Sequence, residues 1–177
     1  MIQIRKGVFE TNSSSTHSIC ISKAPVITYP KRVDFYTGNY GWGRNTVCDT
    51  ASYLYTALYQ MKDKVRISEL KKILNKHGVE CNFHKPKSDD DFYMDCGIDH
   101  CYELSDFISE LFSDEDLLMR YLFSSDSHVH TGNDNRCGPE YEDPAYEAES
   151  RVCGDDCEMI DNPLHDPEHY NYFFKGN

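Results

Sequence analysis

The sequence predicts an α+β fold in a single domain that spans residues 1–177. Apolar residues alternate with polar ones near the N-terminus, recur with helical period from about residue 49, and lose all period after Gly132. The chain therefore divides into a basic β-rich part (1–48), a mostly helical part (49–131) and an irregular acidic tail (132–177). With 177 residues, of which 39% are hydrophobic, it supplies one modest core.

The first part is predicted to be an antiparallel β-region. Two alternating stretches flank the Ser/Thr-rich residues 11–16, a pattern that favours a hairpin over about 2–22. The residues expected to face the core are Ile2, Ile4, Ile19 and Ile21. A second β-rich stretch follows at about 26–36 and is interrupted by Pro30.

Two helix pairs are predicted next. The first pair begins after Asp49, a plausible N-cap, and continues with a helix over about 68–77 that Ser68 caps and Gly78 ends. A short strand, Val79 to Phe83, follows it. The second pair covers about 104–112 and 117–122, with Ser113 as the cap between the two helices.

Charge divides the chain into two opposed halves. Residues 1–87 hold 14 Lys and Arg against 6 Asp and Glu, a net +8, whereas residues 88–177 hold 4 against 24, a net -20. Direct binding to nucleic acid is therefore expected only from the N-terminal half. The acidic half is expected to meet a host protein with a basic surface, unless it is only a solvated face. The expected partner-binding residues are Asp89, Asp90, Asp91, Asp114, Glu115 and Asp116.

Aromatic and basic residues interleave in the N-terminal half. Residues 29–36 combine Tyr and Phe with Lys and Arg, and Tyr40, Trp42 and Arg44 follow. Stacking surfaces with nearby cations are typical of single-strand binding. The alternative is the ordinary use of these residues in a half-buried sheet.

Eight cysteines in a chain without an export signal favour thiols or metal ligands over disulfides. The spacings of the cysteines and histidines point to zinc binding, and a bound zinc ion would hold the acidic tail in a fixed conformation. The alternative is that Cys81 is a small core residue. One candidate ligand set is Cys81, His84, Cys96 and Cys101; the other draws on Cys137, Cys153, Cys157, His165 and His169.

Two segments are candidate catalytic sites. In the first, His17 would act as a base for a nearby hydroxyl such as that of Ser15, unless the segment is only a hydrogen-bonded turn. In the second, His128 and His130 lie two residues apart and would point to one face of a strand. With Asp or Asn nearby, they would complete an open metal site that activates water.

Residues 5–18, RKGVFETNSSSTHS, resemble an N-terminal signature of uncharacterised proteins from bacteriophages and mobile elements of Gram-positive bacteria, and TGNDN at 131–135 resembles the same group. The resemblance implies a mobile-element context. It carries over no catalytic residue.

Context and charge together predict a phage or mobile-element accessory protein in the host cytoplasm. It would bind protein as an anti-defence, anti-CRISPR-like inhibitor whose acidic surface mimics nucleic acid. No stretch is apolar enough to predict a membrane span. One alternative is a metal-dependent hydrolase, or a nucleotidyl- or ADP-ribosyl-type transferase, acting on nucleotides or nucleic acid. Another is a zinc-stabilised interaction module.

Overall fold

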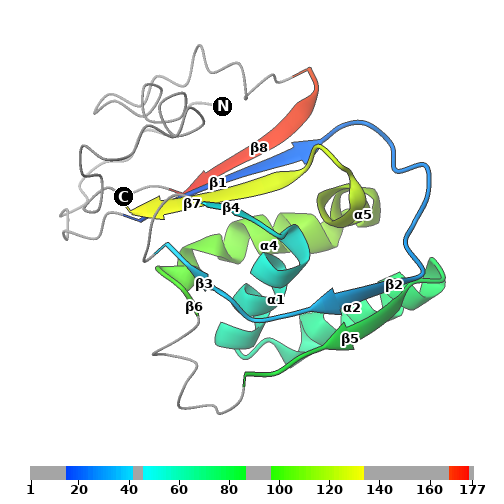
Figure 1. The fold of residues 1–177 in the computed structure, drawn as a ribbon, viewed down its shortest axis with the longest axis horizontal. Coiled ribbons are helices and arrows are strands. Elements are labelled where there is room, and N and C mark those ends of the chain that lie inside the picture. The colour runs from blue at the N-terminus through cyan, green and yellow to red at the C-terminus, as the bar shows by residue number, and fades with distance from the viewer. Residues whose placement is uncertain (1–14, 42–45, 87–96, 134–167, 176–177) are drawn as a thin grey trace.

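The computed structural model describes residues 15–41, 46–86, 97–133 and 168–175. These residues form the α+β arrangement that the sequence predicts. Helices lie between a four-stranded sheet and a shorter two-stranded ribbon (Figure 1). No helix in these ranges is both long and apolar enough to cross a membrane.

The four-stranded sheet is antiparallel and has the order β4-β7-β1-β8. Its strands are β1 (Ser15–Ser22), β4 (Thr46–Cys48), β7 (His128–Asn133) and β8 (Tyr170–Lys175). Ile19 and Ile21 face the core, as predicted, and are at most 1% exposed.

Two sequence-based predictions about this sheet need correction. Strand β1 pairs with β7 on one edge and with β8 on the other, so both of its edges are occupied from His17 to Cys20. The predicted hairpin, in which the start of the chain pairs with β1, is therefore wrong at these residues. The proposed partner residues, with Ile2 and Ile4, lie outside the described residues. The C-terminal tail is not irregular throughout, because β8 completes the sheet from 170 to 175. Its pairing with β1 is long-range and leaves no local signal.

The remaining strands pair in parallel. Strand β2 (Arg32–Phe35) pairs with β5 (Glu80–Phe83), and β3 (Asn39–Tyr40) pairs with β6 (Gly97–Ile98). Parallel neighbours require a crossover, and α1 and α2 lie in the crossover between β2 and β5.

Helix α1 (Thr50–Gln60) is the central helix. The Asp49 side chain accepts a hydrogen bond from the Ser52 N–H, which confirms the predicted N-cap. All nine residues from Thr50 to Leu58 are buried, so the helix has no solvent face over this length. It packs on β2, β6 and β7 and on helices α2 and α5.

The other helices begin at caps that differ from those predicted. Helix α2 (Lys64–Lys76) starts after Asp63, whose side chain accepts from Arg66 N, and not after Ser68. A 3-10 turn, η1 (Cys101–Leu104), leads into α4 (Ser105–Ser113), and α5 (Glu115–Phe123) starts after Asp114 instead of Ser113. In both cases a carboxylate caps the helix instead of the predicted serine, five residues before it for α2 and one residue after it for α5. Gly78 has a φ of 73° and ends α2 as predicted.

Leu58→Ala should destabilise the fold strongly, because Leu58 is fully buried in the central helix. We expect a loss of about 2–5 kcal/mol in the free energy of unfolding, measured by urea denaturation. Val65→Ala is the matched control, since Val65 is 77% exposed, and should change it by less than about 0.5 kcal/mol. Similar losses for both variants would contradict the central position of α1.

Candidate functional site

The two predicted catalytic segments lie on opposite faces of the four-stranded sheet. Ser15 and His17 share the face of Ile19 and Ile21, which packs on the helices, and both are 0% exposed. His128 and His130 pair with Cys20 and Ser18, which alternate with these residues and so lie on the other face. The four residues therefore do not form one catalytic constellation.

His17 belongs to a buried polar cluster. Its Nδ1 lies 2.9 Å from the Tyr53 hydroxyl, and Tyr40 packs edge-on against Tyr53. Burial raises the pKa of Tyr53 well above its ordinary value, so its phenol stays neutral. Gly41, at φ 85°, lies so close that a Cβ there would be 2.8 Å from His17 Nε2. This packing fits a structural role for His17 better than a role as an accessible base.

His128 and His130 project to one face, as alternate residues of a strand do, with ring centroids 5.7 Å apart. His128 Nδ1 lies 3.0 Å from the Asp126 carbonyl oxygen. A carbonyl only accepts, so this contact places a proton on Nδ1, and in the neutral ring Nε2 then keeps its lone pair. Cys20, directly opposite His128, is a nearby thiol that sequence reasoning missed because the β1–β7 register was unknown.

The first predicted zinc set does not converge among its described members. Cys81 faces inward from β5, whereas His84 lies on the exposed side and contacts Asp34. The buried Cys101 directs its Sγ to the Ala57 carbonyl oxygen at 3.6 Å. Within the described ranges, no group of three or more His, Cys, Asp or Glu side chains is placed to hold a metal.

The second zinc set falls almost wholly outside the described residues, as do Cys96 and Asp89, Asp90 and Asp91. The members that cannot be placed are Cys137, Cys153, Cys157 and His165. His169 is described and exposed, and its carbonyl oxygen accepts from Lys23 N at 2.7 Å. Zinc binding by this set stays a prediction.

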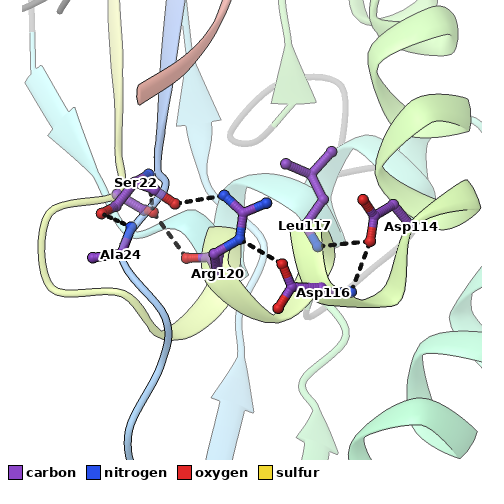
Figure 2. A network of polar contacts seen from close by, with 7 residues as sticks. Ser22, Ala24, Asp114, Asp116, Leu117 and Arg120 are labelled. Carbon is purple, nitrogen blue, oxygen red and sulfur yellow. Dashed lines mark hydrogen bonds and ion pairs between the residues drawn. The ribbon is translucent and has the colours of Figure 1, made fainter. Parts of the chain in front are cut away.

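The predicted partner-binding acids at the start of α5 all have partners within the chain. Asp114 caps the helix by accepting from the Asp116 and Leu117 N–H groups, as Figure 2 shows. Glu115 Oε1 lies 2.8 Å from Lys76 Nζ and 2.7 Å from His77 Nε2, and these contacts lower the pKa of Glu115.

Asp116 is held by Arg120, whose Nε lies 2.8 Å from Asp116 Oδ2. Arg120 Nη1 also donates to the Ser22 carbonyl oxygen at the end of β1, at 2.7 Å (Figure 2). The acids of α5 therefore join this helix to α2 and to the sheet.

A different set of acids is exposed beside them. Glu103, Asp106 and Glu110 are exposed on η1 and α4, and their spacing of three and four residues places them on one side of the helix. Sequence reasoning did not select them, because they are dispersed among the apolar residues of α4 and do not form a run. The helical period that predicts the buried side of α4 also predicts which residues share this exposed side.

A polar network covers the outer face of the β2–β5 ribbon. Asp34 accepts from Arg32 at 2.8 and 3.0 Å, from His84 at 2.7 Å and from Asn82 at 3.2 Å. The hydrogen bonds from Arg32, followed by those from His84 and Asn82, hold the pKa of Asp34 well below its ordinary value. The Tyr36 and His84 rings stack with centroids 4.4 Å apart and an interplanar angle of 11°.

Comparison with known proteins adds no assignment to these features. No protein-family model, no curated protein and no solved structure matches the chain. The resemblance to phage proteins therefore stays a prediction.

Asp34→Asn should weaken the fold in a pH-dependent way. The native pKa of Asp34 is depressed, so its ionised form stabilises the protein above the unfolded pKa of about 3.9, and this contribution is lost as the pH falls further. The difference in unfolding free energy between the wild type and this variant should be constant near neutral pH and shrink below about pH 4. Urea denaturation at several pH values measures it.

Asp106→Asn is the control, because Asp106 has no ion pair among the described residues. It should change stability little at any pH. An Asp34→Asn effect that is unchanged between pH 7 and pH 3 would show that the carboxylate does not act through its charge.

Protein purified without metal-affinity steps should contain about one zinc ion per chain if the second ligand set binds metal. Elemental mass spectrometry measures this content. Cys153→Ser with Cys157→Ser should lose the metal, whereas Cys101→Ser should retain it, since Cys101 is engaged with Ala57 in the core. Metal-free wild-type protein would refute zinc binding.

Proposed function

We propose that this protein is a phage or mobile-element accessory protein that inhibits a host defence protein by occupying its basic, nucleic-acid-binding surface. The observation that carries this proposal is the acidic face of η1 and α4, formed by Glu103, Asp106 and Glu110. All three side chains are exposed. Asp106 and Glu110 lie on α4 and Glu103 lies on the 3-10 turn that leads into it, so the backbone of these helical elements sets their separations.

A contribution to stability explains only part of the acidic face, because the helix dipole favours Asp106 in the first turn of α4 but not Glu110 near the other end. Like charges three or four residues apart destabilise a helix by about 0.2–0.5 kcal/mol per pair. Helix α4 contains no Lys or Arg of its own. Among the described residues, Glu103 has an ion pair with His100 at 3.1 Å, but Asp106 and Glu110 have none. A cationic partner would relieve this repulsion, and complementary potentials also speed association.

Tyr102 gives the same surface an aromatic contact. Its side chain is 72% exposed, directly beside Glu103. Exposed tyrosine is enriched among the residues that dominate binding energy at protein interfaces. A row of carboxylates at fixed spacing, with a tyrosine beside it, suits a protein partner whose binding surface normally contacts the phosphates of nucleic acid.

The proposal moves the interface away from Asp114, Glu115 and Asp116. Their charges are already balanced by a helix N-terminus, by Lys76 with His77, and by Arg120. Charge reversal there would break α5 contacts as well as any interface, so these positions make poor probes. Asp89, Asp90 and Asp91 remain part of the proposed surface on sequence grounds alone.

A metal-dependent hydrolase is the second candidate. It is favoured by His128 and His130, whose rings share one face, and by the Asp126 carbonyl, which holds His128 in the tautomer that ligates a metal through Nε2. The double variant His128→Ala with His130→Ala separates the two functions. An inhibitor that acts by binding tolerates it, whereas a hydrolase loses activity.

The protein is expressed in a set of Gram-positive hosts, each of which carries one defence system that targets nucleic acid. In the host whose defence protein is inhibited, a phage that this system attacks should survive. The readout is the efficiency of plaquing, followed by affinity for the purified defence protein. Asp106→Asn with Glu110→Gln should weaken that affinity about tenfold or more, since each removes a charge from the interface. This variant should fold about as stably as wild type, because the relief of repulsion within α4 offsets the loss of the helix-dipole interaction of Asp106.

The matched control is Glu69→Gln with Glu80→Gln, which makes the same change of charge at exposed positions on α2 and β5. It should protect the phage as well as wild type does. If the wild-type protein protects no phage in any of these hosts, the proposed function is wrong. If both double variants behave alike, the acidic face of α4 is not the interface.

A further inference from the structure

We propose that the outer face of the β2–β5 ribbon binds single-stranded nucleic acid, with the Tyr36–His84 stack as the platform for a base. This inference goes beyond the proposed inhibition and does not depend on it, because it concerns a different surface and the opposite charge. It rests on the arrangement of rings, on the cations around them and on the way Asp34 is neutralised.

The ribbon carries one aromatic pair on each face. Phe35 lies opposite Phe83 in the parallel register, and their rings stack on the inner side at 4.8 Å, where Phe35 is fully buried. One residue further along each strand, Tyr36 stacks on His84 on the outer side. The inner pair fills the core, but Tyr36 remains 53% exposed. Core packing therefore accounts for the first pair and leaves the second unexplained.

The outer pair is held rigidly. His84 Nε2 donates to Asp34 Oδ1 at 2.7 Å, and the same carboxylate accepts two bonds from Arg32. The imidazole is thereby oriented, and the phenol ring stacks on it nearly in parallel. Exposed ion pairs contribute little to stability, so the network's principal effect is to fix these rings. A preorganised aromatic surface binds an unstacked base at low entropic cost.

Cations lie at both ends of the ribbon and beside it. Lys31 directly precedes β2, Lys85 follows His84, and both are exposed. Lys71 of α2 lies close to Cys81, which faces inward, so this lysine belongs to the helix side of the ribbon and not to its outer face. The acids on this face are Asp34, which is paired with Arg32, and Glu80, which lies opposite Arg32 in the register. The N-terminal half as a whole carries a net +8.

Single-stranded nucleic acid fits these features better than a duplex does. Each base offers a flat face that stacks on an aromatic side chain without sequence preference. In a duplex, the faces of the bases are covered by their neighbours, and only the phosphates would reach the lysines. Each strand of the ribbon has four residues with a rise of about 3.3 Å each, so the ribbon is long enough to contact two or three nucleotides.

The test measures fluorescence anisotropy of a labelled 12-nucleotide single strand with the full-length protein at low salt. Wild-type protein should bind, with a slope of about -1.4 for log affinity against log salt if Lys31 and Lys85 meet phosphates. Tyr36→Ala should weaken binding about tenfold or more, and Tyr36→Phe should retain it, because stacking needs only the ring. Lys85→Gln should reduce the magnitude of the salt slope by about 0.7.

Tyr102→Ala is the matched control, since it removes an even more exposed tyrosine from the acidic η1–α4 surface and should leave nucleic-acid binding unchanged. Circular dichroism confirms that the variants are folded. Three results would overturn the proposal: no binding by the wild type at low salt, equal effects of Tyr36→Ala and Tyr102→Ala, or equal affinity for the single strand and its duplex. None of these readouts involves Asp106 or Glu110, so the proposed inhibition is tested separately.

Discussion

The burial of helix α1 on every side from Thr50 to Leu58 is the constraint on which the rest of the structure depends. A helix with no solvent face must place every polar side chain against a partner, because an unsatisfied buried polar group costs about 1–3 kcal/mol. Thr56 Oγ1 donates to the Ser52 carbonyl oxygen and accepts from Gly38 N, while the Ser52 hydroxyl accepts from Tyr36 N. Tyr53 reaches His17 on β1. These bonds determine where β1 and the chain after β2 lie relative to the helix.

The same constraint separates the candidate functional surfaces. Because α1 occupies the centre, the elements packed around it present their outer faces in different directions. The inner side of β1 is committed to the core, which explains why Ser15 and His17 are buried despite a sequence that resembles an active segment. The outer side of the β2–β5 ribbon, where Tyr36 stacks on His84, and the acidic side of α4 are left for solvent and for partners.

Sequence patterns predicted those parts of the fold that depend on interactions between residues close together in the chain. The core positions of the helices, the Asp49 cap and the Gly78 stop all follow from periodicity and capping chemistry, and all are present. The sheet could not be predicted in the same way, since its register joins residues more than a hundred positions apart, such as Ser18 and His130. The predicted caps were wrong where two polar residues competed, because the Asp63 carboxylate caps α2 before Ser68 is reached and the Asp114 carboxylate caps α5 one residue after Ser113.

The predicted partner-binding acids show why consecutive acidic residues do not predict a shared acidic surface. Asp114, Glu115 and Asp116 are adjacent in sequence, so they point in different directions around α5 and each meets a different group of this chain. Glu103, Asp106 and Glu110 are spread over eight residues and lie on one side. The first set is compensated by a helix N-terminus, by Lys76 with His77, and by Arg120. In the second set, Asp106 and Glu110 of α4 have no ion pair among the described residues, and neither do Lys31 and Lys85 beside the β2–β5 ribbon.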